Sequence, residues 1–329
     1  MSVSLTYLER CAGDTGYSVP TLEKVTRLGE IAATIARHPA LSAALALKGG
    51  TALNLCTGLA PTRMSVDLDY NYIAHAERPR MLAERPDVES VVEEVAHRLG
   101  YRVQRSRDEF AGRKVFAAYK SVLGTDARVE IDLNFLFRVP LDGVVDAEMW
   151  QPGDLDRPGV RTVSLLELCV GKLLALLDRA APRDAWDAVR LQSTARELLQ
   201  SPRFRAFFIA ASAILDHPIS TYSHERMRER LTAEMIETQL VPMLAAGLPP
   251  SAAALVDEAW SVLAPFVELR PHETEYVEAV QRGELRPEIL FPDQPDDANV
   301  IANHPAIRWK VENVREHRGR DGRRRTSDE

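Results

Sequence analysis

Hydrophobic residues recur at helical spacing in many stretches of the chain. In residues 21–37 they form a single stripe, which predicts a surface helix that ends at His38-Pro39. Residues 87–99 show the same pattern and are followed by Gly100, a common helix terminator. Beyond residue 160 nearly all of the chain has this pattern, in stretches separated by prolines. These predicted helices are residues 164–178, 183–200, 202–215, 224–245, 251–264 and 273–282.

Three other segments alternate polar and apolar residues with the period of two that is typical of a strand. They are residues 65–73, 114–122 and 128–137, and the last two are expected to form a hairpin. Residues 140–159, rich in Pro, Gly and Asp, are expected to connect two domains. The pattern therefore predicts an N-terminal α/β unit followed by a helical domain.

Composition limits the class of protein. Hydrophobic residues make up 45% of the 329 residues, enough for two modest packed domains. A formal net charge of -7 argues against a general nucleic-acid coat, although a local basic groove could still hold RNA. The three cysteines fit neither a zinc site nor a disulfide framework, and no leader or membrane-spanning segment is evident. A soluble cytoplasmic protein without a membrane partner is expected.

Two aspartates in the strand predicted at residues 65–73 are candidate metal ligands. A strand places Asp67 and Asp69 on one face, with Cα atoms roughly 6.5 Å apart, so both carboxylates could bind divalent cations. Two like charges on one face repel each other, and a bound cation removes that repulsion. Acidic-x-acidic triplets are common by chance among 48 acidic residues, so a solvent-exposed strand face is the alternative.

A second strand could add a third carboxylate. Within residues 128–137, Glu130, Asp132 and Asn134 share one face, while the other face is wholly apolar. If this strand lies beside the first, three carboxylates meet, as a Mg²⁺ or Mn²⁺ site for phosphoryl transfer requires. Glu130 is slightly favoured as the third ligand, and Asp132 stays open.

A glycine turn precedes these strands. Gly49 and Gly50 would let the backbone approach a phosphate and present its N–H groups, and the Thr51 hydroxyl would add another donor. Gly-Gly-Thr also occurs in ordinary turns. Its position between an apolar run and the Asp-x-Asp strand favours phosphate binding.

The sequence Lys48-Gly-Gly-Thr-Ala-Leu53, followed by Arg63-x-Ser65-Val-Asp-Leu-Asp69, resembles the signature of AbiEii/AbiGii-type nucleotidyltransferase toxins. These belong to the polymerase-β-like nucleotidyltransferase superfamily. The resemblance implies an α+β fold, with a small mixed-sheet nucleotidyltransferase domain followed by an all-helical domain. It also implies that the glycine turn and Ser65 bind the NTP and that the paired aspartates hold magnesium. A basic residue on the strand before the third carboxylate is a further family feature, for which Lys114 is the candidate and Lys120 the weaker alternative.

A lysine within the helical domain is another candidate. Ser164-x-x-Glu167 is a capping box that begins a helix, and Lys172 falls inside the apolar arc of that helix, near its border. A lysine whose stem packs on apolar surface while its charge reaches water is the ordinary explanation. The functional alternative is a cation that reaches the β- or γ-phosphate of the nucleotide.

Two aspartates begin the following predicted helix. From the residues alone, Asp184 complements the helix dipole and Asp187 pairs with Arg183 or Arg190. AbiEii-type proteins, however, carry a lysine on one helix and Asp-x-x-Asp on the next. The resemblance therefore implies that Lys172 and Asp187 are catalytic-site residues supported by Asp184.

Together these observations predict a nucleotidyltransferase domain with an N-terminal helix at residues 1–158, a helical domain at 159–316 that contributes Lys172 and Asp187 to the site, and a disordered basic tail at 317–329. The expected reaction is metal-dependent transfer of a nucleoside monophosphate from an NTP to an acceptor hydroxyl. The resemblance implies the 3′ end of tRNA as acceptor, and a toxin with a cognate antitoxin in a toxin–antitoxin or phage-defence pair. The alternatives are transfer to a protein or small-molecule hydroxyl, and a nucleotide-binding module without turnover.

Overall fold

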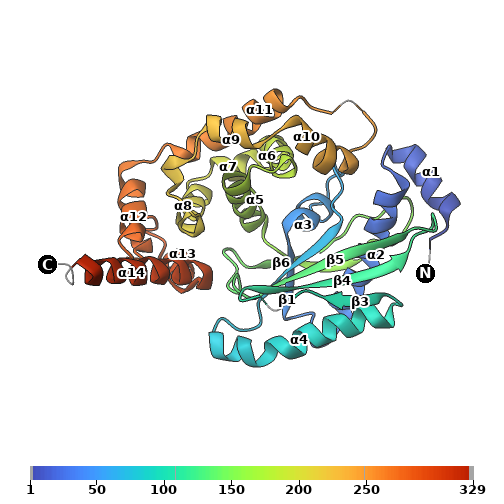
Figure 1. Ribbon diagram of the computed structural model, residues 1–329, viewed down its shortest axis with the longest axis horizontal. Helices are drawn as coiled ribbons and strands as arrows, with labels where there is room; N and C mark the ends of the chain where they lie inside the picture. The colour runs from blue at the N-terminus through green and yellow to red at the C-terminus, as the bar shows by residue number, and fades with distance from the viewer. Residues whose placement is uncertain (1–2, 108, 248, 326–329) are drawn as a thin grey trace. The chain divides into compact units, whose positions relative to one another are not determined.

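The chain divides into two compact units in the computed structural model, which describes residues 3–107, 109–247 and 249–325 (Figure 1). The sheet unit comprises residues 1–168 and 237–249, and the helical unit comprises residues 169–236 and 250–329. The boundary expected after residue 158 falls just before the last strand of the sheet. No helix among the described residues combines the length and the apolar composition needed to cross a membrane.

The sheet unit is built on one mixed sheet of seven strands. In spatial order they are β3 (Arg102–Arg105), β4 (Gly112–Lys120), β5 (Asp126–Asn134), β2 (Asp67–Tyr72), β1 (Leu45–Lys48), β7 (Gly159–Val163) and β6 (Val144–Glu148). The pairs β2–β5 and β1–β7 are parallel, and the other neighbours are antiparallel. The predicted strands at the centre of the unit are confirmed, and so is the hairpin between β4 and β5.

Two helices cover the apolar face of this sheet. Leu68, Tyr70 and Tyr72 of β2 lie on this face and are buried. The Tyr72 hydroxyl donates to Glu84 on the helix α4, and the guanidinium of Arg27 on the helix α2 stacks on the ring of β4 Tyr119. The unit's helices are α1 (Leu5–Thr15), α2 (Val19–Arg37), α3 (Gly49–Leu55) and α4 (Arg78–Arg98), with the first residues of α5 (Leu165–Arg179) and the turn η4 (Val241–Met243).

The helical unit buries a cluster of aromatic rings. Phe208 lies 4.8 Å from Phe266 between ring centroids, and Phe207 lies 5.0 Å from Phe291. Besides the rest of α5, the helices are α6 (Pro182–Thr194), α7 (Arg196–Gln200), α8 (Pro202–Ala211), α9 (His224–Arg230), α10 (Ala233–Met235), α11 (Ala252–Val267), α12 (Pro271–Gln281), α13 (Pro295–Asn303) and α14 (Pro305–Arg325). Shorter helical turns are η1 (Ser212–Ile214), η2 (Ile219–Thr221), η3 (Ile236–Leu240), which crosses the division between units, and η5 (Pro287–Ile289).

The predicted fold class, a mixed-sheet domain followed by helices, is confirmed. Several details differ from the sequence-based expectations. The single helices expected at residues 183–200 and 224–245 are divided, the first into α6 and α7 and the second into α9, α10, η3 and η4. The connection expected at residues 140–159 contains β6 and leads directly into β7, and α4 begins before Pro86 rather than after it. The helix α14 continues through residues 317–325, which were expected to be disordered, since arginine, its commonest residue there, is a good helix former. Residues 326–329 lie outside the described residues.

Candidate functional site

Four carboxylates lie on one face of two neighbouring strands. Because β2 and β5 are parallel and in register, Asp67 pairs with Glu130, and Asp69 pairs with Asp132. Residues paired in this way point to the same side of a sheet, so the four side chains stand opposite the face that α2 and α4 cover. All four are partly exposed. The neighbouring strands on which the prediction of a third carboxylate depended are therefore present.

The glycine turn lies directly against this carboxylate row. Lys48 at the end of β1 pairs with Asp69, and the next residue, Gly49, has a φ of 69°, a conformation that favours glycine. A β-carbon at Gly49 would lie 2.2 Å from Asp69 Oδ2, and one at Gly50 would lie 2.7 Å from Ser65 Oγ. A side chain at either glycine would therefore displace a neighbouring side chain, and at Gly49 it would also strain the backbone.

Two hydroxyl groups hold Asp67 in place. Thr51 is fully buried, and its hydroxyl donates to the main-chain oxygen of Asp67 at 2.5 Å. Ser65 is also buried, and its hydroxyl donates to Asp67 Oδ1 at 3.0 Å. In the structure these residues position the carboxylate, and their contact with a nucleotide stays a prediction.

Lys114 joins the carboxylate row from β4. It pairs with Asp132 across the sheet, and its Nζ lies 2.5 Å from Glu130 Oε1 and 3.7 Å from Asp132 Oδ2. The hydrogen bond to Glu130 raises the pKa of Lys114, so the ammonium stays charged. Lys120, the weaker candidate, lies at the hairpin end of β4 and pairs with Asp126 at 3.1 Å.

The surroundings of Glu130 and Asp132 differ. Glu130 already has an ammonium group at hydrogen-bond distance. Burial raises the pKa of the Asp132 carboxyl, although Lys114 and Lys48 lie near enough to lower it. The two lysines therefore do not fully offset the free-energy cost of burying the ionised Asp132 carboxylate. A proton or a cation bound there would reduce that cost.

The sequence alone did not single out Lys48 and Glu167 as part of this region. Lys48 Nζ lies 5.6 Å from the centroid of the Phe137 ring. Burial raises the pKa of Glu167 to about 7, although the nearby Lys48 charge lowers it. The expected cap is present, since Glu167 N donates to Ser164 Oγ at 3.2 Å, but the Glu167 carboxylate accepts from Leu141 N at 2.7 Å. The sequence feature that could have pointed to Lys48 is its position directly before Gly49 and Gly50.

In the helical unit, α5 and α6 bring Lys172, Asp184 and Asp187 together. Lys172 Nζ lies 2.8 Å from Asp184 Oδ1 and 2.9 Å from Asp187 Oδ2. The side chains of Lys172 and the two aspartates are 9%, 1% and 0% exposed. Arg179, on the surface, also pairs with Asp184 at 2.6 Å. Burial opposes ionisation of Asp184, but the charges of Lys172 and Arg179 lower its pKa overall. This cluster is an ion-pair network rather than a single helix-dipole interaction.

The fit of the carboxylate row to a metal ion depends on its geometry and on its donor atoms. Among the described residues, no group of three or more His, Cys, Asp or Glu side chains has the geometry to hold a metal ion. The chemistry of the row nevertheless fits a hard divalent cation, which prefers carboxylate oxygens. The raised pKa of Asp132 is the observation that favours positive charge at this place.

Comparisons with known proteins cover most of the chain. A family model described as the nucleotidyl transferase AbiEii toxin of type IV toxin–antitoxin systems matches residues 33–262. No curated protein sequence matches. Among solved structures, the chain is similar to MenT4, a nucleotidyltransferase toxin from Mycobacterium tuberculosis H37Rv, with a TM-score of 0.62 and 16% sequence identity. That likeness covers 91% of this chain and 98% of the other, and at this identity it shows a shared fold.

Proposed function

The chain belongs to the AbiEii family of nucleotidyltransferase toxins of type IV toxin–antitoxin systems, and we propose that it transfers a nucleoside monophosphate from an NTP to the 3′ end of a tRNA. The enzyme class and the existence of an antitoxin partner follow from the family. The acceptor, the metal and the individual site residues are the proposal. The observation that carries it is the pairing of Asp69 with Asp132 directly beside Gly49.

We propose that Asp67, Asp69 and Asp132 hold Mg²⁺ or Mn²⁺. Asp132 is preferred over Glu130 as the third ligand because Glu130 already binds Lys114, whereas burial makes the charge on Asp132 costly. A divalent cation bound there would lower the pKa of the attacking hydroxyl and neutralise charge on the departing pyrophosphate. Thr51 and Ser65 support this proposed metal site by holding Asp67 in position through hydrogen bonds.

In the proposed reaction the acceptor hydroxyl attacks the α-phosphorus of the NTP. A bond forms between the acceptor oxygen and this phosphorus, and the hydroxyl proton is released to solvent. The bond from this phosphorus to the oxygen that bridges to the β-phosphate breaks, and pyrophosphate leaves. The protein contributes positioning and charge. The Gly49–Gly50 backbone would approach the triphosphate, and Lys114 and Lys48 would supply positive charge beside it.

We also propose that the Lys172 cluster takes part in the reaction. As the family pattern implies, Lys172 would neutralise phosphate charge, Asp187 would fix its position, and Asp184 would support both. The support from the structure is that two carboxylates bind the Lys172 ammonium within the helical unit. A cytoplasmic location completes the proposal, since NTPs and tRNA are found there and the three buried thiols would stay reduced.

The acceptor can be identified with NTPs labelled at the α-phosphate. Purified protein would be incubated with each of the four NTPs, Mg²⁺, total tRNA and cell protein, and the products separated by size and by nuclease treatment. Label that becomes attached to tRNA and is removed by a 3′ exonuclease is the expected result. Label on protein or on a small molecule would identify that molecule, and not tRNA, as the acceptor. No transfer to any acceptor would contradict the proposal.

A further inference from the structure

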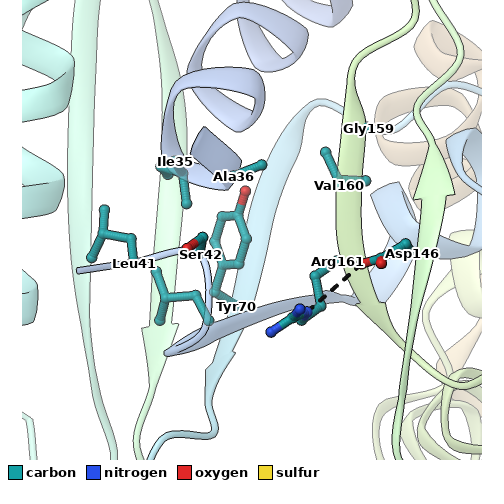
Figure 2. Close-up of a pocket in the computed structure, with 10 residues that line it drawn as sticks. Ile35, Ala36, Leu41, Ser42, Tyr70, Asp146, Gly159, Val160 and Arg161 are labelled. Carbon is teal, nitrogen blue, oxygen red and sulfur yellow. Dashed lines mark ion pairs between the residues drawn. The ribbon is translucent and has the colours of Figure 1, made fainter. Parts of the chain in front are cut away.

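The glycine turn and β2 have neighbours that the proposed reaction does not use. One is a pocket of about 250 Å³ beside Tyr70, at the start of β1 and β7 (Figure 2). Tyr70 points to the opposite face of the sheet from Asp69, and the residues that line this pocket do not identify an occupant. The other is Arg63, whose side chain lies against the glycine turn itself.

Arg63 is a charged side chain in a fully buried place. It is 1% exposed and is among the largest fully buried side chains of the described residues. Arginine keeps its charge in proteins and is almost never buried to this extent without polar partners. The Arg63 Nη1 donates to the main-chain oxygen of Met64 at 2.9 Å. The guanidinium is therefore held by its surroundings and is not available to swing into solvent.

Two side chains lie against the backbone of Gly50. A β-carbon at Gly50 would stand 3.1 Å from Arg63 Nη2 and 2.7 Å from Ser65 Oγ. On the helix that follows, Asn54 Nδ2 donates to the main-chain oxygen of Gly50 at 3.1 Å. The Arg63 guanidinium thus forms part of the wall that sets where the Gly50 backbone can lie.

The segment that carries Arg63 depends on contacts with distant parts of the chain. Residues 56–66 contain no helix or strand. The Tyr17 hydroxyl donates to Pro61 O at 2.7 Å, and Met64 N donates to Met243 O at 2.7 Å. These contacts hold the segment on one side, and the contact of Arg63 with Gly50 holds it against the glycine turn.

We propose that Arg63 is a positioning residue for nucleotidyl transfer, whose guanidinium fixes the Gly50 backbone where the turn receives the triphosphate. This role rests on the proposed function. At 1% exposure Arg63 does not touch the nucleotide, so it acts through Gly50. One nitrogen of its planar fork binds Met64 O while another lies against Gly50. A lysine ammonium on a flexible stem does not reproduce this arrangement.

The kinetics of Arg63→Lys separate this role from one in stability alone. The variant keeps the charge but loses the fork, so the turn should bind the triphosphate less well. The KM for the NTP should rise about ten-fold or more, while the KM for tRNA keeps its wild-type value. A change that only unfolds part of the protein would instead lower kcat, through the smaller amount of active enzyme, and leave both KM values unchanged. Initial rates of label transfer at a temperature where the variant is folded would measure this.

Arg113→Lys is the matched control. Arg113 is also an arginine of the sheet unit with a side chain only 12% exposed, and it donates to Glu89 at 3.0 Å and to Ser106 O at 3.0 Å. These contacts involve α4 and the end of β3, so Arg113→Lys should keep the wild-type KM for the NTP even if it is less stable. A wild-type KM for the NTP in folded Arg63→Lys would contradict the role of Arg63 and leave the proposed function intact. Absence of transfer by the wild type would contradict the proposed function, and with it this role.

A measurement on the wild type covers the case in which Arg63→Lys does not fold. The guanidinium N–H signals of Arg63 can be assigned through the bonds of its own side chain in protein labelled with ¹⁵N and ¹³C. They should shift when the NTP preferred in the transfer assay binds, because Nη2 lies against Gly50. The Arg113 signals should stay unchanged. Arg63 signals that do not move at saturating NTP would overturn the proposal.

Discussion

Gly49 lies directly against the side chain of Asp69. A β-carbon added to Gly49 would stand 2.2 Å from Asp69 Oδ2, far inside van der Waals contact. The residue before it, Lys48, pairs with Asp69 across β1 and β2. The backbone of the turn therefore packs directly against the second aspartate of the Asp-x-Asp pair, and a side chain at Gly49 would displace the Asp69 carboxylate.

Gly49→Ala should reduce nucleotide transfer about 100-fold or more, because displacing Asp69 by about 1 Å would misplace the reacting groups. The left-handed backbone also costs an L-residue about 1–2 kcal/mol. Gly58→Ala is a matched control, since Gly58 has a similar φ of 75° and no neighbouring atom within 4 Å of an added β-carbon. Initial rates of label transfer, with denaturation curves for both variants, would measure this. Equal losses of activity in the two variants would show that backbone strain alone is responsible.

Asp132→Asn should lower transfer about 100-fold or more, as expected for loss of a charge that acts on the transition state. Glu130→Gln should have a smaller effect, because the Glu130 carboxylate is already paired with Lys114 at 2.5 Å. The dependence of the rate on Mn²⁺ concentration would distinguish the two, since only Asp132→Asn should require much more Mn²⁺. The reverse order of effects would assign the third ligand to Glu130.

Glu167 should make the stability of the protein depend on pH. Its pKa is raised from 4.5 to about 7, so the folded protein binds this proton more tightly than the unfolded chain does. The resulting stability is fully present below pH 4.5 and is lost as the pH rises through 7. The free energy of unfolding of the wild type should fall relative to that of Glu167→Gln by on the order of 3 kcal/mol over this window.

Urea denaturation of both proteins at several pH values would measure that difference. Glu84→Gln is a useful comparison, because the hydrogen bond from Tyr72 lowers the pKa of Glu84. Its contribution is present above the unfolded-state pKa and is lost as the pH falls, which is the opposite direction. A wild-type-minus-Glu167→Gln difference that stays constant from pH 4 to pH 8 would contradict the raised pKa.

Lys172→Met should destabilise the protein by about 3 kcal/mol or more, because it leaves two buried carboxylates without their shared ammonium partner. Arg179→Met removes the same charge from Asp184, but the Arg179 side chain is 60% exposed, so the expected cost is below about 1 kcal/mol. Equal destabilisation would show that the burial of the cluster is not decisive.

The same pair of variants tests the proposed role of Lys172 in the reaction. At a temperature where both variants are folded, Lys172→Met should lose label transfer and Arg179→Met should keep it. Full activity of folded Lys172→Met would make the cluster purely structural.

Three strands, β2, β4 and β5, could be predicted from the sequence because each keeps one face against the core. In β2 and β5, buried apolar residues alternate with the carboxylates, and this period of two is visible without a structure. The sequence analysis could only assume that these two strands are neighbours, since alternation says nothing about which strands pair. The contact between Gly49 and Asp69 depends on the pairing of β1 with β2, which alternation does not show either, so it too required the structure.

The edge strands could not be predicted in the same way. Val144 and Val145 of β6 are 36% and 48% exposed, so this strand lacks a buried face that would produce an alternating pattern. It is stabilised by pairing with β7, a contact between segments separated by a proline-rich stretch. The other edge strand, β3, has four residues of which only Val103 is apolar, so it too lacks an alternating pattern.

In the helical unit, spacing placed Lys172 and the two aspartates on successive helices but could not show how they meet. Local rules paired Asp187 with Arg183 or Arg190, one turn away along its own helix. The structure pairs it with Lys172 of α5 at 2.9 Å, a tertiary contact that depends on how α5 and α6 pack.

The most direct test of the account is the rate of label transfer from α-labelled NTP by Asp69→Asn, compared with Asp126→Asn. Both changes remove one aspartate charge, but Asp126 lies at the exposed end of the β4–β5 hairpin, where it pairs with Lys120. Asp69→Asn should abolish Mg²⁺-dependent transfer, while Asp126→Asn should transfer label at the wild-type rate. Transfer by folded Asp69→Asn at a rate close to that of the wild type would contradict the assignment of the carboxylate row as the catalytic site.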